Sequence, residues 1–237
     1  MSLPNVLPIF KRELRSYFNS PVAYVVIVVF LIILGWFFQS SLFLMNVAQL
    51  RVVFDYAPLM FLFFVPAITM RLLAEEKKTG TIELLTTKPV QDVEIVLGKF
   101  LAAWVLLMAT LLPTLLYVVT LMTLGKMDFG PVVTGYIGLL LVGGVYVSVG
   151  LLASSLTDNQ IVAFIMGFLF VFIFFMLDKV LVFVPQGIAS TMEFLSVDYH
   201  FSNIARGVID SRDLIYFGSV LGFSLLLATV SLERRKW

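Results

Sequence analysis

The sequence predicts an all-α membrane protein with six transmembrane helices, and three observations support this fold class. Of the 237 residues, 60% are hydrophobic and 13% are charged, whereas soluble domains carry roughly 25% charged residues. Several apolar segments approach or exceed the roughly 20 residues that a helix needs to cross a bilayer. Lysine and arginine are concentrated in alternate connections between these segments. We therefore expect one membrane domain over residues 1–237.

The six predicted spans are Val22–Leu44, Ala57–Leu73, Phe100–Gly125, Val132–Leu156, Ile161–Leu177 and Leu214–Leu232. The first follows Ser20-Pro21, a hydroxyl residue and then a proline at the first helical position, which is a favourable helix start. This segment is too long for the core of a signal peptide and no small-residue cleavage site follows it, so we expect it to remain in the mature protein.

Residues 1–20, before the first span, carry an amphipathic pattern. Leu7, Phe10, Leu14 and Tyr17 recur at helical spacing, and the basic side chains of Lys11, Arg12 and Arg15 lie on other faces. Such a helix lies in the membrane interface with its apolar face toward lipid. We expect an interfacial elbow helix here; a plain charged flank is the alternative.

Residues 71–99, between spans two and three, hold ten charged residues, five of each sign. We expect a helix that continues from span two into water and ends at Gly80. Thr81 can cap a second helix with Glu83 in its first turn, which Pro89 would end. Residues 91–99 can form an entry helix into span three. This stretch is either a docking surface for another protein or a solvated loop.

The connections that contain residues 11–15, 71–99 and 234–236 hold more lysine and arginine than the opposite set. Such connections face the cytoplasm. Both termini are therefore expected to be cytoplasmic, as six crossings require.

Residues 178–213, between spans five and six, are too apolar for a free loop and contain Pro185 and Gly187. We expect external helices that are partly inserted in the membrane, which is tolerated where protein buries them. Glu193, Asp198 and His200 form a weak candidate metal site, and a surface cluster or a contact with a partner's external domain is the preferred interpretation.

Two pairs of small residues at helical spacing, Gly144 with Ser148 and Gly218 with Gly222, predict close helix packing. A seam between subunits is the alternative. The phenylalanines of span five, among them Phe168 and Phe172, indicate packing or lipid contact, or else the lining of a translocation path.

Several classes of function are disfavoured by what the sequence lacks. There is no cysteine, and the net charge of +1 argues against a nucleic-acid partner. The pairs Gly98-Lys99 and Gly125-Lys126 lack the earlier glycine of a nucleotide-binding loop. We therefore expect no catalytic residue, cofactor or metal on this chain. The predicted spans contain no buried acid or base for proton coupling, although hydroxyls such as Thr110, Thr114 and Ser148 leave ion binding open.

The segment MRLLAEEKKTGTIELLTTKPVQDVEIVLGKF resembles the cytoplasmic coupling segment of ABC-2-type permeases, which are the membrane subunits of ATP-driven exporters. The positions that carry this resemblance are Glu75, Glu76, Lys77, Gly80, Thr81, Glu83, Leu85 and Pro89. FKRELRSYFNSPVAYVV is similar to the elbow helix and first span of that family. SSLTDNQIVAF and YHFSNIARGVIDSRDLIYF resemble its gliding-motility-associated branch.

The resemblance implies a type V exporter-like pair of six-span units above two ABC ATPase subunits, which would bind ATP and Mg. The coupling segment and the elbow helix would contact the ATPase, with Lys77 and Glu83 as polar contacts and Leu84 and Leu85 as apolar ones. The complex would export a cargo or exert force on an external partner.

The implied location is the bacterial inner membrane. The second membrane subunit would be a protein with an external domain or a second copy of this chain. Alternatives are a permease of the kind that serves nitrous-oxide-reductase maturation, or a secondary carrier or membrane scaffold that needs no ATP. The sequence does not indicate the cargo.

Overall fold

The computed structural model describes residues 4–44, 49–81, 90–124, 128–180, 185 and 192–234. Every regular element within these ranges is a helix, and six helical segments are long and apolar enough to cross a membrane. The all-α fold class with six spans is therefore confirmed.

The spans are α2 (Pro21–Leu44), α3 (Arg51–Thr69), α6 (Asp92–Leu111), α8 (Phe129–Ser155), α9 (Gln160–Val180) and α12 (Ser211–Glu233). The third continues from α6 through η1 (Leu112–Thr114) into α7 (Leu115–Leu124), and the shorter helices are α1 (Val6–Asn19), α4 (Ala74–Lys78) and α11 (Val197–Ala205).

The third span begins earlier than its apolar run. A capping box starts α6, in which the backbone N–H of Gln91 donates to Glu94 Oε2 at 2.9 Å. The charged first turns of the helix, up to Lys99, are therefore helical although they precede the first apolar residue of the predicted span. Hydropathy alone does not detect this extension.

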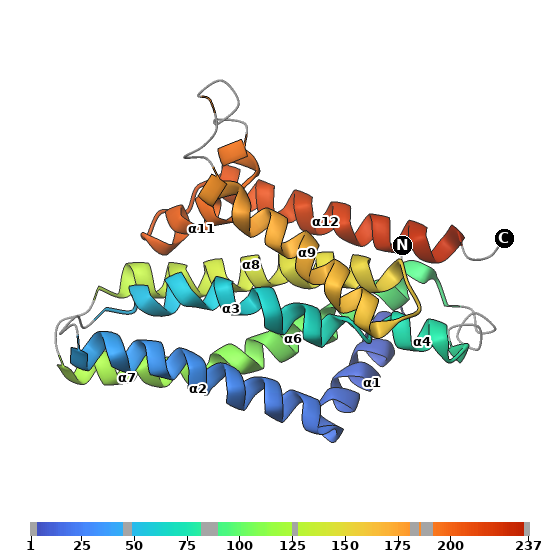
Figure 1. Cartoon of the computed structure of the whole chain (residues 1–237), viewed down its shortest axis with the longest axis horizontal. Helices are drawn as coiled ribbons and strands as arrows, with labels where there is room; N and C mark the ends of the chain where they lie inside the picture. The colour runs from blue at the N-terminus through green and yellow to red at the C-terminus, as the bar shows by residue number, and fades with distance from the viewer. Residues whose placement is uncertain are drawn as a thin grey trace.

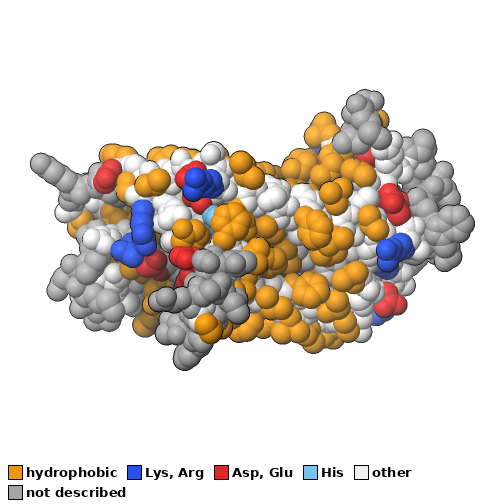
Figure 2. All heavy atoms as spheres, turned by 90° about the horizontal axis from the view of Figure 1, so that it is seen from above, with side chains coloured by type: hydrophobic (Ala, Val, Ile, Leu, Met, Phe, Trp, Pro, Cys, Tyr) orange, Lys and Arg blue, Asp and Glu red, His pale blue; other side chains and the backbone are white. Residues whose placement is uncertain are grey.

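Helix α8 is the centre of the bundle and packs against α3, α6, α9, α11 and α12 (Figure 1). Its glycines permit this close packing: a Cβ atom at Gly143 would lie 2.1 Å from Leu107 Cδ2 of α6. The outer helices α2, α9 and α12 instead expose many apolar side chains. Figure 2 shows hydrophobic side chains over the middle of one face, with charged side chains toward both ends. This middle band is the surface that a bilayer would cover.

Different helices lie at the two ends of the bundle. At one end, here called the terminal end, lie α1, α4, the start of α6 and the end of α12, with both termini nearby (Figure 1). At the other end, the α11 end, lie the start of α3, the end of α9 and α11.

The expectation that the helix of span two continues into water up to Gly80 is met only in part, because α4 is helical but does not follow α3 directly. Turns at residues 70–73 separate α3 from α4, and Leu72, Leu73 and Ala74 are buried. The segment folds back onto the bundle because this removes the apolar side chains of residues 72–74 from water, which is favourable.

Candidate functional site

At the terminal end, α1 lies directly against the first turns of α6. A Cβ atom at Gly98 would be 2.7 Å from Ile9 Cγ2, so only glycine permits this approach. The backbone and side-chain nitrogens of Asn5 each donate to one carboxylate oxygen of Glu94, at 3.0 Å. The start of α1 is therefore fixed to the start of the third span.

Four charged side chains join α1, α4 and α6 at one place; this group, Arg12, Glu13, Glu76 and Lys99, is called the ion cluster. Lys99 Nζ lies 3.2 Å from Glu13 Oε1 and 2.9 Å from Glu76 Oε1. Arg12 Nη2 contacts the same two oxygens at 2.6 and 3.0 Å. The Lys99 side chain is only 1% exposed. Because two cations face two carboxylates, the buried charge is compensated, as burial of ions requires.

The cluster shifts the ionisation of its members on α1. Burial by itself raises the pKa of Glu13, but the charges of Lys99 and Arg12 outweigh it, so this pKa lies below its ordinary value of 4.5. Burial by itself lowers the pKa of Arg12, but Glu13 and Glu76 outweigh it and raise this pKa. Both changes favour the charged forms at neutral pH.

Helix α4 is held on the end of α8 by hydrogen bonds. Ser154 Oγ donates to the carbonyl of Met70 at 3.0 Å and accepts from the backbone N–H of Leu73 at 3.1 Å and Ala74 at 3.0 Å. These bonds satisfy backbone groups that the break between α3 and α4 leaves unpaired within the helices.

A second contact joins α4, α8 and α12. Lys77 Nζ donates to the carbonyl of Ser155, and Ser231 Oγ of α12 donates to the same carbonyl at 2.9 Å. Lys77, predicted as a contact for another protein, is thus directed into its own chain.

Tyr17 connects α1 to the end of α3. Its hydroxyl donates to the carbonyl of Ile68 at 2.8 Å. This carbonyl lacks its usual helical partner because the N–H of Leu72 donates to Thr69 instead. Burial raises the pKa of Tyr17, so the hydroxyl remains a donor. Through Tyr17 and Glu13, α1 thereby contacts the second and the third span.

Between α1 and α4 lies a cleft of about 460 Å³, lined by the ion cluster together with Ser16, Tyr17, Ser20, Arg71, Leu72, Glu75, Thr79 and Thr81. Its walls are the two elements that the sequence predicts as docking elements, the elbow helix and the coupling segment. A displacement of either wall would act on α6 and α8 through the bonds described above.

The structure places the other predicted coupling residues as follows. Glu75 pairs with Arg71 of its own segment at 3.2 Å. Gly80 has φ 68°, in the left-handed region, which agrees with its predicted role as a helix terminator. Thr81 is exposed and its hydroxyl lies 3.0 Å from that of Thr79. Glu83, Leu84, Leu85 and Pro89 lie outside the described residues.

The basic residues of α1 divide into two groups. Lys11, Arg12 and Arg15 are all exposed, and Arg12 in addition belongs to the ion cluster, with its side chain 49% exposed. Of the predicted packing residues, Gly144 lies against α12 and α6, since its Cβ would be 3.3 Å from Leu221 Cδ1 and 3.4 Å from Trp104 Nε1.

Ser148 is buried and donates within α8 to the carbonyl of Val145, at 2.8 Å. Gly218 and Gly222 have no described atom within 4 Å of a built Cβ. Close packing at these two glycines is therefore not seen among the described residues, and the alternative, a seam between subunits, stays a prediction.

The weak metal candidates at the α11 end are not brought together. Asp198 faces Lys179 at 2.5 Å, and His200 Nδ1 lies 2.6 Å from Asp213 Oδ1. Within the described part of the chain, no group of three potential metal ligands occurs.

Sequence reasoning missed the roles of Glu13, Lys99 and Ser154. Lys99 served only as a marker of topology, and Ser154 as part of a resemblance. One signal was available: Glu13 is the single acid within the basic run Lys11–Arg15, which favours a cationic partner elsewhere.

The comparisons with known proteins agree with this architecture. A search of curated proteins finds no match. A family model described as ABC-2 family transporter protein matches residues 46–197, which include spans two to five and the stretch between α3 and α6. This range is more than half of the sequence, and the chain therefore belongs to the ABC-2 family of transporter proteins.

Proposed function

We propose that this permease subunit receives mechanical work from a partner ABC ATPase at its terminal end and transmits it through the ion cluster into the membrane spans. Membership in the ABC-2 family implies a membrane subunit of an ABC transporter that works with an ABC ATPase. ATP and Mg would bind to that partner. The observation that carries the proposal is the ion cluster, which joins the elbow helix, α4 and span three.

Rigid contact is what this role requires. Separating the partners of a buried ion pair leaves a buried charge uncompensated, so we expect Lys99, Glu13 and Glu76 to move together. Close-packed interiors transmit strain in the same way. An ATPase that pushes on α1 or α4 would therefore shift α6 through Lys99 and α8 through Ser154, rather than deform a loop.

The exposed cations beside the cleft supply the docking surface in this proposal. Lys11 and Arg15 of α1 and Lys78 of α4 are exposed. Charges of this kind orient a partner and set its register more than they add affinity. Glu83, Leu84 and Leu85 would add contacts in the adjoining segment.

The proposal places the terminal end in the cytoplasm and the chain in a bacterial inner membrane, supported by the excess of lysine and arginine in the connections at that end. The resemblance of residues 154–164 and 199–217 to the gliding-motility-associated branch supports a complex of that type. Its second membrane subunit would be a protein with an external domain or another copy of this chain. The complex would export a cargo or exert force on the external partner.

A glycine substitution tests the proposal with a matched control. Gly80 has φ 68° and nothing within 4 Å of a built Cβ, so Gly80→Val strains only the backbone that leads into residues 81–89. Left-handed backbone costs a side-chain residue about 1–2 kcal/mol. We expect Gly80→Val to lose co-purification of the ATPase, or to uncouple ATP hydrolysis from transport in the purified complex.

The control is Gly207→Val, which imposes at least as much backbone strain at the α11 end, where φ is 98°. It should keep the ATPase and its coupled activity. Normal coupling in Gly80→Val would refute the proposed site. An intact native complex that contains no ATPase would instead favour a secondary carrier or scaffold.

A further inference from the structure

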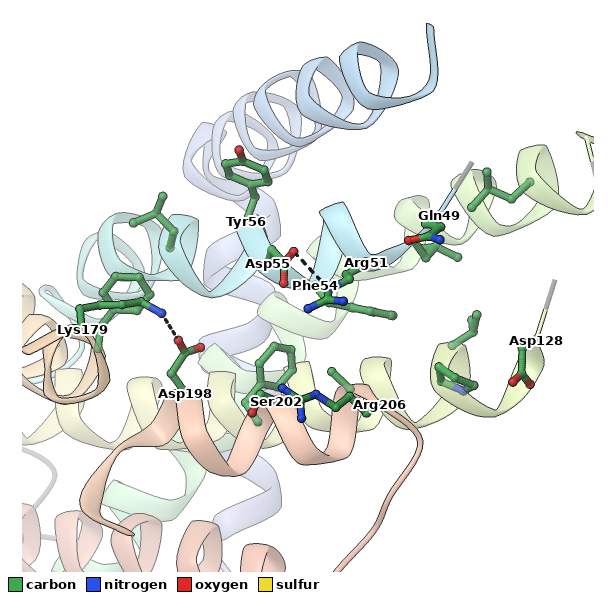
Figure 3. A pocket seen from close by; sticks show the side chains of 18 residues that line it. Gln49, Arg51, Phe54, Asp55, Tyr56, Asp128, Lys179, Asp198, Ser202 and Arg206 are labelled. Carbon is green, nitrogen blue, oxygen red and sulfur yellow. Dashed lines mark hydrogen bonds and ion pairs between the residues drawn. The ribbon is translucent and has the colours of Figure 1, made fainter. Parts of the chain in front are cut away.

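A cavity of about 730 Å³ lies at the α11 end, between the start of α3, the end of α9, the start of α8 and α11 (Figure 3). Part of its wall is apolar, with Phe54, Phe175 and Phe201 among the lining residues. Charged side chains from α3, α9 and α11 also line it. This cavity is called the arginine pocket, after Arg51 and Arg206.

Two of the three cations in the arginine pocket are available to a ligand. Lys179 is already neutralised, because its Nζ lies 2.5 Å from Asp198 and 3.3 Å from Asp178. Arg51 is only loosely paired, at 3.9 Å from Asp55. Arg206 forms no ion pair with any residue that the structure describes.

The two available guanidinium groups border the same space. In Figure 3, Arg51 from α3 and Arg206 from the end of α11 lie on opposite sides of the gap between these helices. Guanidinium groups bind phosphate through paired hydrogen bonds in a fixed plane. The geometry therefore favours a phosphate between them.

The acidic side chains of the pocket disfavour a ligand that carries negative charge and no positive charge. Asp55 and Asp128 also line the cavity, and the Asp55 side chain is 63% exposed and held only loosely by Arg51. Asp128 caps α8 through the N–H of Gly130. A ligand whose phosphate is accompanied by an ammonium group matches both signs of charge.

An apolar track leaves the pocket along α3. Tyr56, Leu59 and Phe63 share one face of this helix, at spacings of three and four residues. Tyr56 stacks on Phe37 of α2 at 4.1 Å, and Phe63 contacts Phe168 of α9 at 5.1 Å between ring centroids. Leu59 lines the pocket and is 40% exposed, and Phe63, one turn further, is 53% exposed. The track thus runs from the charged pocket onto the apolar middle of the molecule.

We propose that the arginine pocket binds a zwitterionic phospholipid, with its phosphate between Arg51 and Arg206, its ammonium group toward Asp55 and an acyl chain along Leu59 and Phe63. This inference does not rest on the ATPase partner, because the pocket lies at the other end of the bundle from the ion cluster.

Native mass spectrometry of the full chain in detergent tests the proposal. The probes are phosphatidylethanolamine, phosphatidylglycerol, which lacks the ammonium group, and glycerophosphoethanolamine, which lacks the acyl chains. We expect phosphatidylethanolamine to be retained best. The double variant Arg51→Gln and Arg206→Gln should lose at least about tenfold in affinity, as removal of charge-assisted hydrogen bonds implies. Asp55→Asn should abolish the preference for phosphatidylethanolamine over phosphatidylglycerol.

The control is Arg212→Gln, an exposed arginine at the same end that does not line the pocket. It should retain phosphatidylethanolamine like the unaltered chain. Equal retention by the double arginine variant overturns the proposal, as does equal retention of the soluble glycerophosphoethanolamine, which would indicate a phosphate site without a lipid track.

A second measurement identifies the occupant in the native membrane. A photo-crosslinking residue at Leu59 should label lipid, and Leu59→Trp, which fills the track, should reduce phosphatidylethanolamine retention without loss of the folded protein. Crosslinks from position 59 to a protein partner alone would overturn the lipid assignment.

Discussion

Two lysines of this protein each lie between two carboxylates, one at each end of the bundle. Lys99 lies between Glu13 and Glu76, at 3.2 and 2.9 Å. Lys179 lies between Asp178 and Asp198, at 3.3 and 2.5 Å. The distances are similar, but Lys99 is 1% exposed and Lys179 is 48% exposed. The comparison teaches that contact distances alone do not rank ion pairs, because water screens the exposed lysine and not the buried one.

The two lysines also differ in what they connect. Lys99 holds together residues of α1, α4 and α6 that are far apart in the sequence, and it does so inside the bundle. Lys179 joins the end of α9 to α11 at the rim of a pocket. The terminal end is thus joined by buried ion pairs, whereas Lys179 at the α11 end stays accessible to water.

The largest expected effect comes from removing the buried lysine. Lys99→Met leaves Glu13 and Glu76 close together without the amine that separates them, while the apolar stem still fills the site. Breaking a buried pair on one side costs about 3–5 kcal/mol. We expect the lower end of this range, about 3 kcal/mol, because both carboxylates retain Arg12 and some exposure. Thermal unfolding of the purified chain in detergent measures it.

Two further variants sharpen this test. Lys78→Met removes an exposed lysine of the same end and should change stability little. Adding Glu13→Gln and Glu76→Gln to Lys99→Met should recover part of the loss, because no buried carboxylate then lacks its cation. Arg12, the one member of the cluster left charged, is 49% exposed and can be solvated. If Lys99→Met unfolds at the same temperature as Lys78→Met, the ion cluster does not hold the terminal end together.

The second effect concerns the hydrogen bonds of Ser154. Ser154→Ala removes the partner of the Met70 carbonyl and of the N–H groups of Leu73 and Ala74. Unsatisfied buried polar groups cost about 1–3 kcal/mol each, and partial relaxation should leave about 2 kcal/mol in total. Faster amide hydrogen exchange at Leu73 and Ala74 reports the loss.

The control for Ser154→Ala is Ser148→Ala in the same helix. Ser148 is also buried, but its hydroxyl bonds only to a carbonyl of its own helix. Exchange at residues 73 and 74 should stay unchanged in Ser148→Ala. Equal exchange in both variants would show that Ser154 does not hold α4 on α8. The proposed transfer of movement from α4 to α8 would then be refuted.

The third effect is an acid dependence confined to the terminal end. The pKa of Glu13 lies below its ordinary value of 4.5 in the folded protein. Such a group contributes stability above its unfolded pKa, and this contribution is lost as the pH falls through the folded pKa. Stability should therefore fall below about pH 4.5 as Glu13 is protonated.

The variant Glu13→Gln isolates this contribution. It should be less stable than the unaltered chain at neutral pH, and the difference between the two melting temperatures should narrow in acid. A difference that stays constant from neutral pH to about pH 3.5 would show that the charge of Glu13 does not stabilise the fold.

The sequence was sufficient to predict the spans and the helix terminator, because both are local properties. Long apolar runs are read from composition, and the left-handed backbone at Gly80 follows from the lack of a Cβ atom. Hydropathy correctly located all six spans, with differences at their ends where charged turns are helical.

The ion cluster could not be predicted, because its members meet only through tertiary packing. Glu13 and Lys99 are 86 residues apart, and no periodicity relates them. For the same reason Lys77 was predicted to contact a partner, although it donates to the carbonyl of Ser155. The sequence predicts which segments hold the charged residues. It does not predict whether each side chain points into the bundle or into solvent.

The smallest expected effect tests the comparison at its exposed end. Lys179→Met breaks contacts to Asp178 and Asp198 that are as short as those of Lys99. Exposed ion pairs contribute about 0.2–1 kcal/mol, so Lys179→Met should lower the melting temperature far less than Lys99→Met does. Salt should separate the two variants further, because screening weakens the contacts of Lys179 and leaves those of Lys99 largely intact. If the two substitutions are equally costly at every salt concentration, burial does not distinguish the ends, and the α11 end is as firmly held as the terminal end.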